Sequence, residues 1–281
     1  MKFLRYKNKT GDVIPCVLTE SGGVHNLSSI VSDIGPSTLG PDMIKAVSRA
    51  MSDLPVLDTD DLFLAPPMDT PRNIWCVGLN YSDHAAEAGM AIPDEPILFN
   101  KSTATYCGPN DDILFSPKMT KLDWEVELGI VIGKPVLNIT KDQAPDHIFG
   151  YVLINDVSER AWQLERGGQW VKGKSFPNFC PTGPYLVPKE SVGDINNLDL
   201  WLDVNGARMQ TGSTSKMIFD VNTIVSYMSE FCKLEPGDLI LTGTPPGVGA
   251  GMKPQRWLNI GDKVTLGITG LGEQSQTVVK M

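Results

Sequence analysis

The chain has 281 residues, of which 41% are hydrophobic and 20% are charged, and its formal net charge is −9. These proportions are those of a globular protein with a sizeable core, and they exclude a disordered chain. The acidic balance, without clustered Lys or Arg, argues against a nucleic-acid partner. Because the first residues lack a signal peptide and no apolar run approaches the ~20 residues of a membrane helix, we expect a cytoplasmic protein with no membrane partner.

The first part of the chain alternates short apolar runs with turn residues. Residues 13–18 and 24–27 read as a hairpin, and residues 41–51 have helical spacing with Pro41 and Asp42 suited to a first turn. Three prolines between residues 64 and 71 mark the best boundary. The sequence therefore predicts a small N-terminal α+β domain over residues 1–70 and a larger domain over residues 71–281.

The larger part is predominantly β. Its 27 glycines and 21 prolines, counted over the whole chain, fit tight turns between short strands. The spacing predicts strands over 73–78, 123–132, 151–154, 238–242, 263–268 and 276–279, and helices over 83–88, 158–166 and 221–231.

The five cysteines are scattered and form no CxxC pair. This pattern favours reduced thiols over a disulfide framework or a zinc site. A catalytic role for Cys180 stays open, although a buried, inert thiol is the preferred interpretation.

Two glutamates, Glu125 and Glu127, precede and enter an apolar, β-branched run. Residues two apart in a strand point to the same face, so we expect the two carboxylates side by side. Asp156 follows another apolar run and is placed at the end of a strand. Three carboxylates make an oxygen-rich site suited to Mg²⁺ or Mn²⁺, with Ca²⁺ as an in vitro substitute, and poorly suited to zinc. The competing interpretation is a solvated acidic face and an ordinary turn residue.

His84 and Glu87 lie three residues apart in a predicted short helix with glycine at both flanks. A carboxylate beside an imidazole raises its basicity, which suits a general base that deprotonates water. The glycines would let the segment move as a lid. An exposed His–Glu pair on a helix surface has the same spacing.

Three further segments carry side chains that can contact a substrate. Arg160 and Gln163 share a helical face beyond Asp156 and could hold a carboxylate or carbonyl group. Lys174, in a glycine-containing loop, could neutralise a developing enolate. Thr244 lies in a Gly/Pro-rich loop whose amides and hydroxyl could bind an anion. Taken singly, each also fits ordinary surface or turn structure.

Taken together and in this order, these segments resemble the fumarylacetoacetate hydrolase family over residues 72–281. The matching motifs are GLNYSDHAAEAG at 78–89, DWEVELGIVIG at 123–133, GYVLINDVSERAWQ at 150–163, KGKSFPNFCPTGP at 172–184 and PGDLILTGTPPGVG at 236–249.

The resemblance implies a β-rich α+β fold, a mixed β-sandwich roll of the fumarylacetoacetate hydrolase type, with a small N-terminal domain and usually a homodimer. It also implies specific roles for the residues of the motifs. Mg²⁺ or Mn²⁺ would be held by Glu125, Glu127 and Asp156; His84, Glu87 and Lys174 would be catalytic; and Arg160, Gln163 and Thr244 would contact the substrate.

The family commonly cleaves a C–C bond in 2-oxo or 2,4-dioxo acids by hydrolysis, and some members are decarboxylases. Residues 163–170 resemble a bacterial subgroup assigned to 3-deoxy-2,4-dioxo sugar acids or labelled ureidoglycolate lyases. We therefore expect a metal-dependent hydrolase acting on a small-molecule 2,4-dioxo acid, of the acylpyruvate or sugar-acid type. Oxaloacetate decarboxylase-type or ureidoglycolate lyase-type activity is the alternative, and a metal-stabilised binding protein is the non-enzymatic one. One departure from the family is Pro177, where many members have Asp after the lysine-containing triplet.

Overall fold

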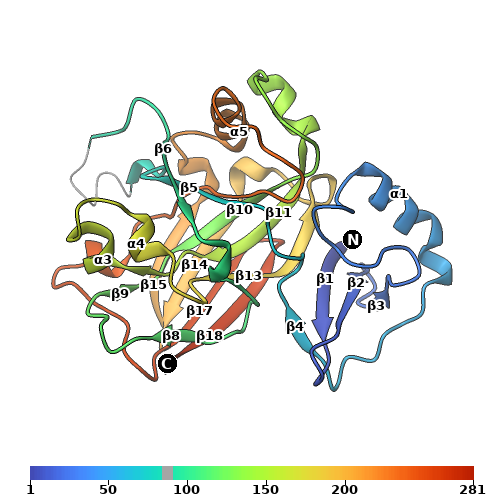
Figure 1. The fold of residues 1–281 in the computed structure, drawn as a ribbon, viewed down its shortest axis with the longest axis horizontal. Coiled ribbons are helices and arrows are strands. Elements are labelled where there is room, and N and C mark those ends of the chain that lie inside the picture. Colours follow the sequence, from blue (N-terminus) through green and yellow to red (C-terminus); the bar gives the residue numbers. More distant parts are fainter. Residues whose placement is uncertain (84–90) are drawn as a thin grey trace.

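The computed structural model describes residues 1–83 and 91–281. Within these residues, most strands belong to an eleven-stranded mixed sheet or to a five-stranded sheet (Figure 1). The strands of the large sheet are β1 Lys2–Lys7, β2 Val13–Leu18, β3 Val24–Asn26, β4 Phe63–Ala65, β5 Ile74–Gly78, β6 Ile97–Lys101, β7 Tyr106–Cys107, β10 Val126–Ile132, β11 Ile148–Asn155, β13 Cys180–Pro188 and β16 Leu239–Leu241.

The remaining strands and the α-helices are fewer and mostly short. The five-stranded sheet contains β8 Ile113–Phe115, β14 Asp199–Val204, β15 Ala207–Ser213, β17 Lys263–Ile268 and β18 Gly272–Lys280, and a two-stranded ribbon pairs β9 Leu122–Asp123 with β12 Ser158–Glu159. The helices of the described residues are α1 Pro41–Ala50, α3 Arg160–Leu164, α4 Val171–Lys174 and α5 Val221–Ser229. None of these described helices is long and apolar enough to cross a membrane.

The first 70 residues form the hairpin and helix that the sequence predicts. Strand β2 pairs antiparallel with both β1 and β3, and β4 adds to the other edge of β1. Strand β1 also reaches β13 through the pair Phe3 and Leu186, so the hairpin continues the large sheet. Side chains from both parts share one hydrophobic cluster. The division into two domains at residue 70 stays a prediction.

Strands β10 and β11 show how the sequence builds two faces on one sheet. Val126, Leu128 and Ile130 point into the main hydrophobic core, which lies against the five-stranded sheet and α5. Val131, Val152 and Ile154 point to the opposite face, toward the N-terminal cluster. Because side chains alternate along a strand, the face that carries Val131 and Ile154 also carries the acids at the ends of both strands.

Two predicted elements are wrong in extent. The predicted strand over 123–132 is interrupted, because Asp123 pairs with Ser158 in the two-stranded ribbon and β10 begins only at Val126. The predicted helix over 158–166 covers only Arg160–Leu164, because the two preceding residues form β12. The predicted helix over 83–88 falls almost entirely on residues 84–90, which lie outside the described residues.

Candidate metal and substrate site

Three buried carboxylates meet where β10 begins and β11 ends. Glu125 precedes β10, Glu127 lies within it, and Asp156 directly follows β11. The antiparallel pairing joins the two ends, and the Asp156 amide donates to the Glu125 carbonyl oxygen at 2.9 Å. Their side chains each offer a carboxylate oxygen within 4.8 Å of the others, and the residues are only 6%, 2% and 0% exposed. The interpretation as a solvated acidic face is therefore wrong.

Basic side chains surround this cluster. Lys174 Nζ donates to Glu125 Oε2 at 2.7 Å and to Asp156 Oδ2 at 2.6 Å, so it bridges two of the acids. Arg160 donates to the second oxygen of Glu125. Lys101, which the sequence analysis missed, donates to Asp156 Oδ1 and to the Val157 carbonyl oxygen. The β-strand context of Lys101 gives no sign of this role, since a single lysine near a strand end is usually solvated.

The two glutamates are in opposite electrostatic situations. Burial opposes ionisation of Glu125, but Arg160 and Lys174 outweigh it and hold its pKa well below the ordinary value. Burial together with the charges of Asp156 and Glu125 raises the pKa of Glu127 well above the ordinary value. Among the described residues, Glu127 receives one hydrogen bond, from the Gly243 amide at 2.7 Å. A buried acid with so little compensation needs a proton or a cation.

The donor set fits a divalent cation. Three carboxylates within reach of one point supply the oxygen ligands that Mg²⁺ and Mn²⁺ prefer. A cation bound there would lower the pKa of Glu127 and remove the cost of burying it unpaired. The residues expected from the sequence to hold the metal are therefore brought together in the fold.

Lys174 is placed by the close packing of two short helices. A Cβ at Gly173 would lie 2.4 Å from the Glu159 carbonyl oxygen and 2.5 Å from the Gln163 amide nitrogen. The glycine therefore lets α4 approach α3 closely enough for Lys174 to reach the acids. The Glu159 side chain caps α3 by accepting from the Trp162 amide at 2.6 Å and also accepts from the Thr120 and Lys121 amides.

Arg160 is oriented by an acid that the sequence analysis did not single out. Asp123 accepts from Arg160 Nε at 2.8 Å and from the amides of Gly249 and Ala250. Arg160 in turn donates to Gln163 Oε1 at 3.0 Å. Asp123 thus ties the arginine to the loop after Thr244, and the signal available in the sequence was its place in the DWEVE motif.

The loop at 242–246 is hydrogen-bonded to the first residues of β10. Thr244 Oγ1 donates to the Val126 carbonyl oxygen at 2.9 Å and accepts from Gln210 Nε2 at 2.8 Å. Gln210 also accepts from the Val126 amide. Gly243 has a φ of +94°, a conformation that favours glycine, and this turn aims its amide at Glu127. Thr244 is therefore fixed at the wall of the site.

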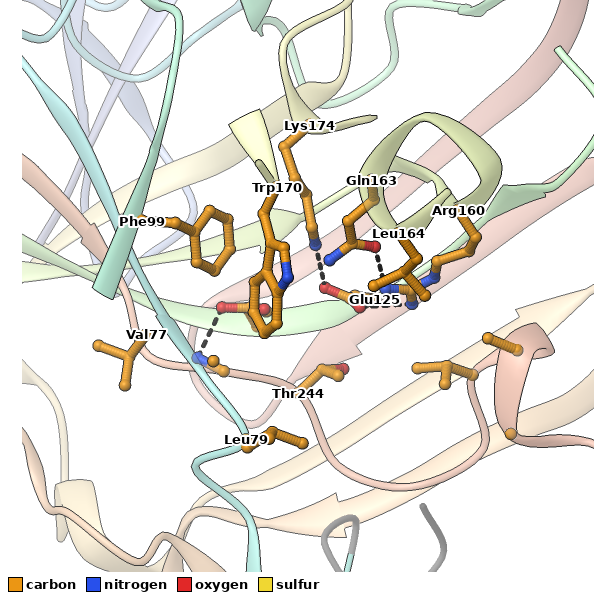
Figure 2. A pocket seen from close by; sticks show the side chains of 16 residues that line it. Val77, Leu79, Phe99, Glu125, Arg160, Gln163, Leu164, Trp170, Lys174 and Thr244 are labelled. Carbon is orange, nitrogen blue, oxygen red and sulfur yellow. Dashed lines mark hydrogen bonds and ion pairs between the residues drawn. The ribbon is translucent and has the colours of Figure 1, made fainter. Parts of the chain in front are cut away.

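One cavity of about 270 Å³ is lined by Glu125, Glu127, Arg160, Gln163, Lys174 and Thr244, together with apolar residues. Figure 2 shows Lys174, Gln163 and Arg160 gathered around Glu125, with Thr244 beneath them and Phe99 and Trp170 on the other side. Asp156 lies behind this wall, fully buried. The cavity is therefore polar and charged at one end, and aromatic and aliphatic at the other. Lys174 Nζ lies between the two, 5.3 Å from the centroid of the Phe99 ring.

The remaining sequence predictions have different outcomes. His84 and Glu87 lie outside the described residues, so their catalytic roles stay predictions. Cys180 is fully buried, as predicted, and burial raises the pKa of its thiol to about 12. Pro177 does not displace Lys174. The loop around Pro177 is held by a hydrogen bond from the Ser102 amide to Ser175 and by one from Asn178 to the Asp112 carbonyl oxygen.

Comparison with known proteins gives consistent matches. Residues 73–279 match the family model for the fumarylacetoacetate (FAA) hydrolase C-terminal domain. A relative from Burkholderia multivorans, whose name as a hydrolase is only provisional, is 47% identical over 280 residues, which is 98% of both chains.

Two solved structures are similar over the whole length. Fumarylacetoacetate hydrolase from Exiguobacterium antarcticum has a TM-score of 0.86 and 35% identity and is matched over 100% of both chains. Maleylpyruvate hydrolase from Sphingobium sp. SYK-6, solved with manganese(II) and pyruvate, has a TM-score of 0.79 and 25% identity and is matched over 100% of this chain and 99% of the other. With its β-rich fold and its acid cluster, this chain belongs to the fumarylacetoacetate hydrolase family of enzymes.

Proposed function

We propose that this protein is a Mg²⁺- or Mn²⁺-dependent hydrolase that cleaves a C–C bond in a 2,4-dioxo acid. The observation that carries the proposal is the buried cluster of Glu125, Glu127 and Asp156 on one wall of a cavity that also presents cationic and hydroxyl groups. The solved relative with manganese(II) and pyruvate supports the choice of a divalent metal and a 2-oxo acid.

A bound divalent cation would act as a Lewis acid toward the 2-oxo group of the substrate. Arg160 and Gln163, which contact each other at the cavity wall, would receive the C1 carboxylate. Thr244, fixed against β10, would border the same group from the opposite wall. These three side chains orient the substrate so that its distal carbonyl carbon points toward the apolar end.

The proposed reaction begins with proton transfer from water to His84, with Glu87 orienting the imidazole. The hydroxide adds to C4, and the C3–C4 bond then breaks with its electron pair passing to C3 and onto the C2 oxygen. Lys174, buried beside Glu125 and Asp156, stabilises the negative charge of this enolate. Protonation at C3 completes a 2-oxo acid, and the other product is a carboxylic acid.

The experiment is a substrate panel of acylpyruvates, a 2,4-dioxo sugar acid, oxaloacetate and ureidoglycolate, with Mg²⁺ or Mn²⁺ and with EDTA. We expect acylpyruvate cleavage that EDTA abolishes and added metal restores. Metal-independent turnover, or turnover of oxaloacetate or ureidoglycolate alone, would contradict the proposal.

His84→Ala separates hydrolysis from decarboxylation, because decarboxylation needs no nucleophilic water. We expect the variant to lose acylpyruvate hydrolysis by about 100-fold or more and to keep its metal affinity. His25→Ala is the matched control, because His25 hydrogen-bonds the Leu54 carbonyl oxygen in the N-terminal part. Unchanged hydrolysis in His84→Ala would remove His84 from the mechanism and favour a different base.

A further inference from the structure

The apolar end of the cavity is built around an aromatic pair. The rings of Phe99 and Trp170 meet edge to face, with centroids 5.2 Å apart. The Trp170 ring lies against the backbone of β5, where a Cβ at Gly78 would come within 2.6 Å of Cζ3. Val77 and Leu79, on either side of this glycine, border the same cavity. The glycine therefore lets the edge of the indole pack against the strand, and Phe99 and Trp170 lie together on one side of the cavity (Figure 2).

Of the residues that the structure describes, the two cations that line the cavity are paired with acids, and one of them lies near the aromatic pair. Lys174 Nζ is 5.3 Å from the centroid of the Phe99 ring. Lys174 and Arg160, the lysine and arginine among the described lining residues, both contact Glu125. In the described part of the chain, four carboxylates face three cations: Asp123, Glu125, Glu127 and Asp156 face Lys101, Arg160 and Lys174. The proposed divalent cation and the C1 carboxylate of a substrate would bring these charges into balance, which leaves no excess positive charge for a second carboxylate.

The consequence for a substrate follows from the cost of burying charge. A second carboxylate at the far end of a substrate would lie among Val77, Phe99 and Trp170. The nearest cation there, Lys174, already donates to Glu125 and Asp156, so burial of the second carboxylate would be poorly compensated. The many hydroxyl groups of a sugar acid would also find few polar partners there. A flat, neutral group would instead exchange water for aromatic contacts.

We infer that Phe99 and Trp170 are specificity-determining residues that select 2,4-dioxo monoacids with an apolar or aryl acyl group over dicarboxylates and sugar acids. The inference rests on the proposed function, since it names the substrate class for that same site. The solved maleylpyruvate hydrolase acts, by its name, on a substrate with two carboxylates, so this chain would differ from it at the distal end of the pocket.

Binding of two uncleavable analogues tests the inference apart from turnover. 2-Oxo-4-phenylbutanoate and 2-oxoadipate share the 2-oxo acid head and lack the 4-oxo group, but end in a phenyl ring and a carboxylate. Calorimetry on the metal-loaded protein should show the phenyl compound binding about tenfold or more tightly. Equal affinity, tighter binding of 2-oxoadipate, or no binding of either would overturn the inference.

Two variants assign the preference to residues. Trp170→Ala should reduce the ratio of the two affinities about tenfold, and Trp170→Phe should restore most of it. An unchanged ratio in Trp170→Ala would also overturn the inference.

The turnover panel separates this inference from the proposed function. If the phenyl preference in binding is found but no 2,4-dioxo acid is cleaved, the reaction is wrong and the pocket assignment holds. If acetylpyruvate and maleylpyruvate are both cleaved, and 4-phenyl-2,4-dioxobutanoate is not preferred, the reaction holds and the substrate class is wrong.

Discussion

This protein contains two kinds of buried acid. Glu159 is fully buried and accepts from the backbone amides of Thr120, Lys121 and Trp162. Glu127 is almost as buried, yet among the described residues it receives a hydrogen bond from the Gly243 amide alone. The first acid is satisfied by fixed donors and holds the chain in place, whereas the second depends on a proton or a cation. The difference in donors, and not burial, separates a structural acid from a functional one.

The largest expected effect comes from removing the carboxylate of Glu127. Glu127→Gln should lower kcat/KM by roughly a thousandfold, because it removes a metal ligand and with it several kcal/mol of transition-state stabilisation. The same variant, measured without metal, should be as stable as the wild type or more so, since a neutral amide needs no counter-charge.

Glu159→Ala is the matched comparison. It leaves three partly buried backbone amides without their side-chain acceptor and should cost about 1–3 kcal/mol of unfolding free energy. Metal affinity of the folded variant should stay close to that of the wild type. Urea unfolding and metal titration of both variants check this. A large loss of metal-free stability in Glu127→Gln would show that the Glu127 carboxylate also stabilises the fold.

The next effect concerns the lysine that bridges two of the acids. Lys174→Met should lower kcat by about 100-fold to 1000-fold with a smaller change in KM, because the enolate loses a buried cation. Lys172→Met, on the same helix, removes an exposed lysine that donates to the Arg166 carbonyl oxygen and should leave kcat unchanged. Steady-state kinetics on both variants decide the point, and equal effects would mean that Lys174 acts only through helix stability.

A smaller effect follows from the packing of α4 on α3. Gly173→Ala should lower kcat/KM about tenfold, because a Cβ there would force α4 away from Glu159 and Gln163 and shift Lys174. Gly193→Ala is the control, since a Cβ at that position meets no heavy atom within 4 Å. Wild-type kinetics in Gly173→Ala would show that the helix contact does not position the lysine.

The smallest expected effect is a pH dependence of stability. The pKa of Glu127 is raised in the folded protein, so its contribution is fully present below its ordinary value of 4.5 and is lost as the pH rises toward the folded value. In EDTA, the wild type should therefore lose stability relative to Glu127→Gln from about pH 5 upward, by at most about 1.4 kcal/mol per pH unit.

Thermal unfolding between pH 5 and pH 8 measures that difference. Adding Mn²⁺ should reverse the trend, since metal binding displaces the proton and becomes stronger as the pH rises. Parallel stability curves for the wild type and Glu127→Gln would show that Glu127 is ionised in the metal-free protein.

The sequence was most informative where the spacing of apolar residues and the chemistry of the acidic residues indicated the same structure. Alternation along residues 126–132 predicted both a strand and the face on which Glu127 lies, and the structure has both. The contacts of Lys101 and Asp123 escaped prediction, because they depend on segments 55 and 126 residues away in the chain. The interruption of the strand at Trp124 and Glu125 escaped for the same reason, since local propensity does not show that Asp123 pairs with Ser158.

We propose that Glu125, Glu127 and Asp156 form a divalent-metal site. The most direct test is a crystal structure of the protein soaked in Mn²⁺, with anomalous diffraction recorded near the manganese edge. We predict one strong peak within about 2.0–2.3 Å of an oxygen from each of the three carboxylates. A fully ordered site with no peak there, and Lys174 still bridging Glu125 and Asp156, would contradict it.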